Sequence, residues 1–209
     1  MSAPVLVCFA LEGEAKPFRK LIRDRADVRV LVTGMARRNT ERAIQTALKT
    51  IQPSHVFTCG VAGALDPSLR IGDVLFETRA KGITERLSAA GAKPGTFTCE
   101  DRVAITRAEK AALREQTKAD AVEMESAFIQ TACAEQIIEC ATVRAVSDIA
   151  DDDLPLDFNS LWTPRQKLSP AKLAFAILKA PQKIPALMRL GKNSAFAAEQ
   201  LALVLAKII

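Results

Sequence analysis

The stretch Val56-Phe57-Thr58-Cys59-Gly60-Val61-Ala62-Gly63 joins a short apolar run to a Gly-x-x-Gly turn. A run rich in β-branched and aromatic residues is typical of a buried strand, and paired glycines are typical of the tight connection after it. The turn lacks the third glycine of a dinucleotide fingerprint and the Lys-Ser/Thr of a P-loop. The stretch therefore predicts a central strand, and its glycines alone indicate no particular ligand.

Similar runs recur on both sides of this strand and predict further strands over Val5–Ala10, Val28–Thr33, Val74–Glu77 and Ala141–Ala145. Apolar residues at helical spacing predict helices between them, over Glu14–Asp24, Asn39–Ile51, Arg107–Gln116 and Glu125–Gln136. Strands that alternate with helices predict an α/β sandwich. The segment Arg79–Thr98 has no clear period, so we expect a loop with a poorly defined strand there.

The chain contains no internal repeat and no linker before Asp151, which predicts a single domain over residues 1–209. Beyond that point the pattern changes, and residues 154–209 are expected to form a basic helical appendage. Its helices are expected to break at Pro164, Pro170, Pro181, Pro185 and Gly191, which leaves Ser194–Ile209 as the last helix.

Composition favours a soluble globular protein, because 49% of the residues are apolar and 25% are charged. The first apolar run is too short for a signal peptide, and no run approaches the ~20 residues of a membrane span. Five cysteines without a Cys-x-x-Cys pair fit buried thiols in a reducing compartment, so we expect a cytoplasmic protein. The lone histidine, His55, begins a strand, which disfavours Cys–His catalysis and a zinc site; no metal or cofactor is expected.

The net charge of +5 is concentrated near the C-terminus. From Pro164 to Ile209 there are eight Lys or Arg residues and one acid, Glu199, so the rest of the chain is slightly acidic. A nucleic-acid-binding surface over the whole protein is therefore not expected.

Polar residues follow several predicted strands, at the edge where open α/β sheets bind ligands. They are Glu12 and Glu14, Thr33–Arg38, Gly60–Gly63 and Arg144–Asp148. Glu123 and Glu125 add two acids at the head of a helix that we expect to begin near Val122. Each has a simpler explanation when taken alone. Acids at a helix start complement the helix dipole or cap the helix, and Arg37 and Arg38 are of a type that is usually solvated.

Taken together and in order, four motifs resemble the methylthioadenosine/S-adenosylhomocysteine nucleosidases of the purine nucleoside phosphorylase superfamily. The motifs are Phe9-Ala10-Leu11-Glu12-Gly13-Glu14, Thr58–Leu65 with Ile71-Gly72-Asp73-Val74, Ala121–Ser126 and Val143–Asp151. The resemblance covers about residues 4–153. It implies a three-layer sandwich with a central mixed, partly barrel-like sheet, a nucleoside substrate and a homodimer. The basic tail is similar to that of the hopanoid-associated phosphorylases, which are linked to removal of adenine from an adenosyl-lipid.

The resemblance also implies roles for individual residues in breaking an N-glycosidic bond. It makes Asp148, held by Ser147, the proton donor to purine N7, and Glu14 the base that activates water. It places Arg144 near that water or an anion. Glu125 would accept both ribose hydroxyls, with Met124 packed on the sugar. Further substrate contacts are implied for Glu123, Val61, Ala62, Gly63, Val103 and Ala104, while Arg37 and Arg38 could gather phosphate.

Two departures from the family pattern concern the substrate. Val61 stands where the family usually has Ser, and Val103-Ala104 stands where a Phe-Ile pair is expected. The chain also has no Tyr. No Gly-Asp-Pro-x-Arg phosphate loop occurs before Arg38, so hydrolysis is favoured over phosphorolysis; a non-catalytic nucleoside-binding protein is a third alternative.

The tail interleaves basic and apolar residues between Leu168 and Gly191. Ordinary surface helices that leave their lysines in water have this composition. Helices that lie on anionic membrane have it too, so peripheral membrane contact through the C-terminal helices is an alternative expectation.

Overall fold

The computed structural model describes residues 3–23, 25–163 and 169–209. Asp24, Pro164 and Leu168, each used in the predictions above, lie outside these ranges. The described chain is built around a mixed sheet whose main path runs β2-β1-β3-β8-β4-β5. The strands are β1 (Val5–Phe9), β2 (Val28–Val32), β3 (His55–Ala64), β4 (Val74–Glu77), β5 (Lys93–Pro94), β6 (Phe97–Cys99), β7 (Ala121–Glu123) and β8 (Glu139–Asp148).

The centre of the sheet is parallel, because β1 pairs with β2 and β3, and β3 pairs with β8 in the same direction. On one side β4 runs antiparallel to β8. The end of β3 also pairs antiparallel with β7, which pairs in turn with β6. The sheet is thus mixed and branches where β3 ends, and the carboxyl ends of β1, β3 and β8 meet near this branch.

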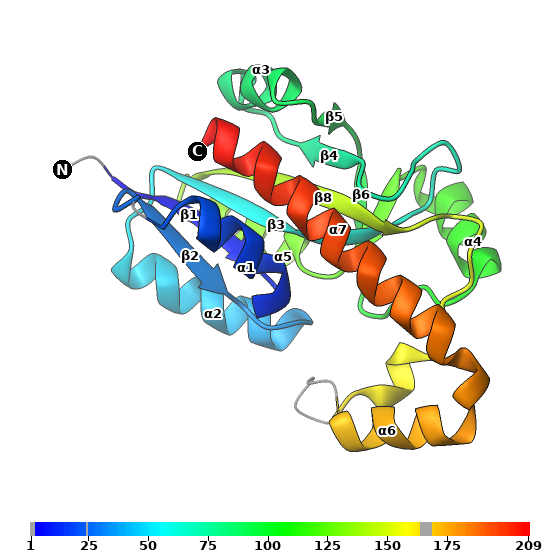
Figure 1. The fold of residues 1–209 in the computed structure, drawn as a ribbon. Coiled ribbons are helices and arrows are strands. Elements are labelled where there is room, and N and C mark those ends of the chain that lie inside the picture. The colour runs from blue at the N-terminus through cyan, green and yellow to red at the C-terminus, as the bar shows by residue number, and fades with distance from the viewer. Residues whose placement is uncertain (1–2, 24, 164–168) are drawn as a thin grey trace.

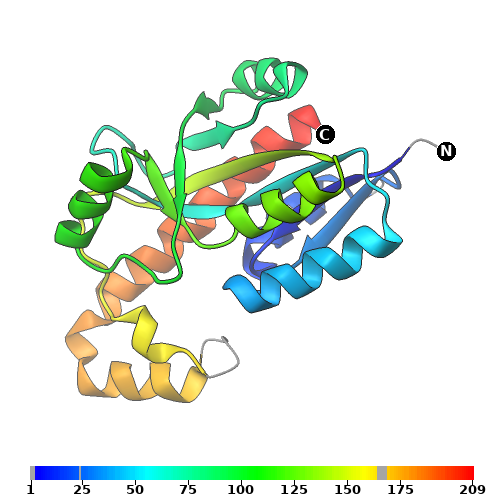
Figure 2. The ribbon, with the colours of Figure 1, turned by 180° about the vertical axis from the view of Figure 1, so that it is seen from behind.

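Helices cover both faces of the sheet and confirm the predicted three-layer α/β architecture. Figure 1 shows α1 (Glu12–Leu21) and the long α7 (Ile184–Ile208) on one face, with α3 (Lys81–Ala89) beside the end of α7. Figure 2 shows α2 (Arg37–Thr50) and α5 (Ser126–Glu135) on the other face. The helix α4 (Arg107–Thr117) lies at the end of the sheet.

Each face has its own apolar core, formed by the side chains that alternate along the central strands. Toward α1 and α7, Phe9, Phe18 and Leu201 belong to one buried cluster. Toward α2 and α5, Cys8 and Ile44 belong to another. The apolar run at Val5–Ala10 is continuous because β1 is buried on both faces.

Three segments differ from the sequence predictions. The expected loop at Arg79–Thr98 contains α3, anchored by Ile83 and Leu87, one helical turn apart. The strand β3 continues through the Gly-x-x-Gly segment, since Gly60–Gly63 pair with β8 across a register shift. The residues Val122 and Glu123 belong to β7, and the following helix begins at Ser126.

The predicted appendage divides into two parts. After the short 3₁₀ turn η1 (Phe158–Leu161), α6 (Pro170–Lys179) contributes no buried residue, and it lies away from the sheet (Figure 1). A second 3₁₀ turn, η2 (Pro181–Lys183), leads into α7, whose C-terminal half packs into the core. No helix in the described part of the chain combines the length and apolar character needed to cross a membrane.

The expected breaks at Pro185 and Gly191 are wrong, because α7 is continuous from Ile184. A proline is tolerated in the first turn of a helix, where its missing N–H has no intrahelical partner. A glycine inside a helix costs only about 1 kcal/mol, which the buried C-terminal half of α7 outweighs.

Candidate active site

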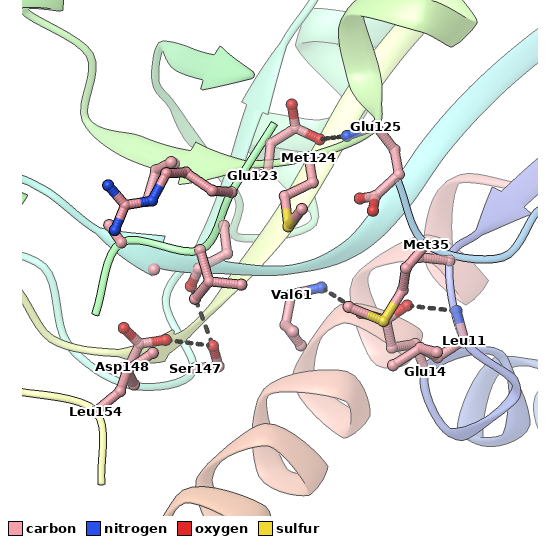
Figure 3. A pocket seen from close by; sticks show the side chains of 17 residues that line it. Leu11, Glu14, Met35, Val61, Glu123, Met124, Glu125, Ser147, Asp148 and Leu154 are labelled. Atoms are coloured by element: carbon pink, nitrogen blue, oxygen red, sulfur yellow. Dashed lines mark hydrogen bonds between the residues drawn. The ribbon is translucent and has the colours of Figure 1, made fainter. Parts of the chain in front are cut away.

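A pocket lies where β1, β3, β7 and β8 end, at the sheet edge that the strand pattern predicts. It brings together residues from four separate motifs of the sequence (Figure 3). The predicted residues in its wall are Glu14, Val61, Ala62, Gly63, Val103, Ala104, Glu123, Met124, Glu125, Ser147 and Asp148. Asp148 and Ser147 lie at one end of the pocket, Glu14 and Glu125 lie at the other, and Met124 lies between them (Figure 3).

Glu14 is fixed at the first turn of α1 by two backbone donors. Its carboxylate accepts hydrogen bonds from the Leu11 N–H at 2.9 Å and the Val61 N–H at 3.1 Å. The side chain is buried, and burial raises the pKa of Glu14, although these donors and the Arg144 guanidinium oppose the shift. A carboxylate with a raised pKa is a stronger base, as activation of water requires.

Glu123 is the most completely engaged acid of the site. It accepts hydrogen bonds from the Ser126 hydroxyl at 2.7 Å, from the Ser126 N–H at 2.8 Å and from the Glu125 N–H at 3.0 Å. Burial alone would raise the pKa of Glu123, but Arg144 and the Ser126 donors hold it below its usual range. This carboxylate therefore caps the N-terminus of α5 and neutralises Arg144.

Arg144 lies under the pocket on β8, with 1% of its side chain exposed. Its Nη2 is 2.5 Å from Glu123 Oε2, 3.3 Å from Thr58 Oγ1 and 3.7 Å from Glu125 Oε2. Its Nε is buried and has no hydrogen-bond partner among the residues that the structure describes. The guanidinium thus acts from below on the acids around it and does not line the pocket itself.

Gly60 makes room for this arrangement. A Cβ added there would lie 2.5 Å from Arg144 Nη1 and 3.0 Å from Glu14 Oε1, and the residue has φ +154°. The glycine is therefore required by the close approach of a buried guanidinium and a buried carboxylate to the β3 backbone.

Glu125 follows β7 and points toward the end of the pocket that holds Glu14 (Figure 3). Burial raises its pKa to about 7; Arg144 opposes the shift, and the neighbouring Glu123 and Glu14 add to it. Near neutral pH this acid is divided between its two protonation states, so its ability to accept hydrogen bonds depends on pH.

Asp148 is held on both of its carboxylate oxygens. The Ser147 hydroxyl donates to Oδ1 at 2.8 Å, as the resemblance implies. The Lys110 ammonium donates to Oδ2 at 2.6 Å, and this lysine is absent from the sequence prediction. Lys110 is the one residue of α4 that is fully buried. Because the rest of the helix is ordinary and polar, the sequence does not indicate that this lysine pairs with Asp148.

The wall made by Val103 and Ala104 is held by a second residue that the sequence does not reveal. Asn159, on η1, accepts from the Val103 N–H at 2.9 Å and donates to the Val103 carbonyl at 2.9 Å. Among the described residues no aromatic side chain lines the pocket. A planar ligand would therefore be packed by aliphatic side chains and Met124.

The predicted anion-binding arginines lie outside this pocket. Arg37 and Arg38 are exposed at the start of α2, and Arg37 pairs with Glu41 at 2.9 Å and stacks on Phe128. The cation at the rim is Arg102, which pairs with Glu109 at 2.6 Å. Within the described residues no group of three or more His, Cys, Asp or Glu side chains is arranged to hold a metal ion.

A sandwich with a carboxylate-lined pocket at the end of its parallel strands matches what the resemblance to the nucleosidases and nucleoside phosphorylases implies. The family model of the phosphorylase superfamily matches residues 12–80 and 77–179. The chain therefore belongs to the phosphorylase superfamily.

Curated relatives are of moderate similarity. The chain is 27% identical over 158 residues to the aminodeoxyfutalosine nucleosidase of Campylobacter jejuni, covering 60% of this chain and 67% of that protein. It is 25% identical over 167 residues to the 5′-methylthioadenosine/S-adenosylhomocysteine nucleosidase of Glaesserella parasuis, covering 64% and 73%.

Solved structures share the fold over nearly the whole chain. The futalosine hydrolase of Helicobacter pylori matches with a TM-score of 0.75 at 16% identity, covering 98% of this chain and 96% of that one. A methylthioadenosine/S-adenosylhomocysteine nucleosidase from Neisseria meningitidis matches with a TM-score of 0.74 at 19% identity, covering 99% and 98%. At these identities the likeness concerns the fold alone.

Proposed function

We propose that this protein hydrolyses the N-ribosidic bond of a 5′-substituted, adenosine-like nucleoside and releases the purine base. The observation that carries the proposal is the separation of acids in one pocket, with Asp148 at one end and Glu14 and Glu125 at the other (Figure 3). The curated relatives named above are nucleosidases, which supports the same reaction.

The chemistry follows from the charge that develops as the bond breaks. The sugar becomes positive and the departing purine becomes negative, so a proton delivered to N7 from Asp148 assists departure. Glu125 accepts hydrogen bonds from the ribose hydroxyls and fixes the ring. Glu14 orients a water molecule on the opposite face and takes its proton as the water oxygen bonds to C1′. Two carboxyl groups that flank the bond with water between them lead to inversion.

The electrostatics of the pocket favour water over phosphate as nucleophile. Glu14, Glu123 and Glu125 surround the nucleophile end, and the buried Arg144 is already engaged by Glu123. A phosphate anion placed there would meet carboxylates, because among the described residues the cations below the pocket and at its rim, Arg144 and Arg102, are paired with Glu123 and Glu109. Phosphorolysis would require the side chain of Arg37 or Arg38 to turn into the pocket. A non-catalytic nucleoside-binding protein would need no acid to transfer a proton.

The 5′ substituent is proposed to be apolar. Leu11 and Met35 lie at the end of the pocket that holds Glu14 (Figure 3), and Val61, which stands where the related nucleosidases usually have Ser, adds a further apolar side chain to the lining. An adenosyl-lipid is the extreme case of such a substrate.

Peripheral membrane contact through the C-terminal helices belongs to the same proposal. The exposed fractions of Phe175, Leu178 and Met188 are 58%, 78% and 59%, and basic residues flank them. We further propose a cytoplasmic homodimer. The five free cysteines support the compartment, the family resemblance supports the dimer, and sedimentation velocity tests the dimer.

The decisive experiment separates the three reactions. Wild-type protein is incubated with a 5′-alkylthioadenosine, with and without phosphate, and adenine, free sugar and sugar 1-phosphate are measured. Hydrolysis gives adenine and free sugar without phosphate, Glu14→Gln abolishes it, and Glu12→Gln on the exposed face of the same helix serves as the control. Faster formation of sugar 1-phosphate than of free sugar would establish phosphorolysis, and ligand-induced stabilisation without base release would establish a binding protein.

A further inference from the structure

Lys110 lies behind Asp148, outside the pocket wall, and its side chain is 1% exposed. A lysine is rarely fully buried unless its charge is paired. Its ammonium donates to Asp148 Oδ2 at 2.6 Å, to the Ile149 carbonyl at 2.7 Å and to the Asp152 carbonyl at 3.1 Å. All three N–H groups are therefore used, and within the described part of the chain Asp148 is the charged partner.

This arrangement bears on the source of the proton that reaches the base. Both oxygens of Asp148 accept hydrogen bonds, one from Ser147 and one from Lys110. The Ser147 hydroxyl has one proton and two acceptors in reach, Asp148 Oδ1 at 2.8 Å and the Ala62 carbonyl at 3.3 Å. When that proton points at the nearer acceptor, Asp148 carries no proton of its own to donate. Of its two donors the ammonium is much the stronger acid, since a serine hydroxyl does not ionise near neutral pH.

We propose that Lys110 is a positioning residue for the leaving-group acid, and that it passes a proton to Asp148 as Asp148 protonates the purine. The proposal rests on the proposed nucleosidase function. The Nζ–H bond breaks and an O–H bond forms on Asp148; that O–H bond breaks as N7–H forms. The electron pair of the C1′–N9 bond leaves with the purine, and the water oxygen bonds to C1′ while its proton goes to Glu14.

The surroundings of Lys110 suit both of its protonation states. After losing one proton the amine keeps two N–H groups, which match the Ile149 and Asp152 carbonyls, and its lone pair faces Asp148. The side chain of Asp148 is 14% exposed and opens to the pocket, so solvent can return the proton through it once the base has left.

Two kinds of variant distinguish the effect of the positive charge of Lys110 from the effect of the proton that it transfers. Lys110→Arg keeps a cation beside Asp148, but a guanidinium does not release its proton. Lys110→Met removes the cation and its proton, and Lys110→Gln, which keeps an N–H donor for Asp148 without the charge, serves as the second variant if Lys110→Met fails to fold. Thermal melting of each variant shows which of them are folded.

The first readout is the dependence on the leaving group, which a general disturbance of the site would not alter. The second is the activity of Lys110→Arg, which keeps a cation beside Asp148 and so separates proton transfer from placement of the carboxylate. The probes are a 5′-alkylthioadenosine, whose base needs a proton, and 4-nitrophenyl riboside, whose nitrophenolate leaves without one. We expect folded Lys110 variants to lose about 10²-fold or more in kcat on the nucleoside. On the nitrophenyl riboside they should stay within about threefold of wild type, with KM little changed on both probes.

Equal losses on the two probes, or a Lys110→Arg variant as active as wild type on the nucleoside, would overturn the proton transfer while leaving the nucleosidase function intact. If the wild-type protein releases no base from the nucleoside, the proposed function fails, and the inference on Lys110 fails with it.

Discussion

Arg144 Nη2 lies 2.5 Å from Glu123 Oε2, and the two side chains are 1% and 0% exposed. This buried ion pair joins the last central strand to the start of α5. It also fixes the charge at the base of the pocket, because Glu125 and Glu14 both lie within the electrostatic reach of the same guanidinium. The Arg144–Glu123 pair at the base of the site therefore also stabilises the fold.

Removing Arg144 should destabilise the protein strongly. In Arg144→Met the Glu123 carboxylate stays buried without its cation, and breaking such a pair typically costs about 3–5 kcal/mol. The matched control is Arg37→Met, which removes an exposed pair with Glu41 and should change the free energy of unfolding by less than about 1 kcal/mol. Urea unfolding of the two variants measures the difference, and similar midpoints would contradict a structural role for Arg144.

Gly60→Ala should impair the site through a single added methyl group. The new Cβ would lie 2.5 Å from Arg144 Nη1, and Arg144 cannot move aside without leaving Glu123. We expect a loss of stability and, from displaced acids, a fall in kcat of at least about tenfold. Gly82→Ala, in α3 with nothing within 4 Å, is the control and should be neutral or slightly stabilising. Equal behaviour of the two variants would argue against crowding at Gly60.

Asp148→Asn should remove the proton delivered to the base. General acid catalysis contributes about 10²–10⁴-fold, so kcat should fall by that factor while nucleoside binding persists. Asp151→Asn, an exposed acid three residues further on, provides the control. Base release by Asp148→Asn within a few-fold of wild type would remove Asp148 from the mechanism.

The sequence predicts the sandwich because its central strands are continuous apolar runs and most of its helices carry a regular apolar face. It fails at α3, where only Ile83 and Leu87 are buried and the rest of the helix is polar or small. It also fails at β7, where Val122 and Glu123 read as the start of a helix. Their strand conformation depends on pairing with β3 and β6, which lie far away in the sequence.

The sequence also identifies the acids of the pocket, because they lie within motifs that follow the strands. It does not distinguish the acid that opens to the ligand from the acid that is fully engaged below it. Glu123 and Glu125 differ by two positions, yet Glu123 is bound by Arg144 and Ser126, while the pKa of Glu125 is raised to about 7. Lys110 and Asn159 act through tertiary contacts alone, so no local pattern indicates them.

Binding of the nucleoside should weaken as the pH falls below about 7. Glu125 must be ionised to accept hydrogen bonds from both ribose hydroxyls at once, because protonation turns one of its oxygens into a donor, and its pKa in the folded protein is about 7. We therefore expect KM to rise toward pH 5.5 in the wild type. Glu125→Gln should have a high KM at every pH, and a wild-type KM that is flat between pH 5.5 and 8 would contradict the role.

Glu125 should also affect stability, and here the protein benefits from low pH, whereas nucleoside binding benefits from high pH. A raised folded-state pKa means that the folded protein binds more protons than the unfolded chain between about 4.5 and 7, so stability falls as pH rises through that window. Glu125→Gln lacks this charge and should melt at a higher temperature than wild type at pH 8, with a smaller difference at pH 5. Melting curves at the two pH values measure it.

The exposed tail should bind anionic lipid surfaces. The helix α6 has no buried residue, Phe175 and Leu178 project from it, and the Lys179 ammonium lies 4.4 Å from the Phe175 ring. Each well-placed basic residue contributes roughly 1 kcal/mol on an acidic membrane, an attraction that salt screens. We expect co-sedimentation with phosphatidylglycerol vesicles at low salt, less at high salt, and none with neutral vesicles.

Matched charge reversals distinguish this surface from a general effect of net charge. Lys179→Glu, Lys183→Glu and Arg189→Glu together should abolish the binding. The control, Lys16→Glu, Lys20→Glu and Lys49→Glu, changes the net charge equally on exposed positions of α1 and α2 and should retain it. An equal loss of vesicle binding in both triple variants would show that the binding depends on the net charge of the protein and not on the tail. A change of sedimentation coefficient in the tail variant alone, without vesicle binding by the wild type, would instead show that α6 packs against a second copy of this chain.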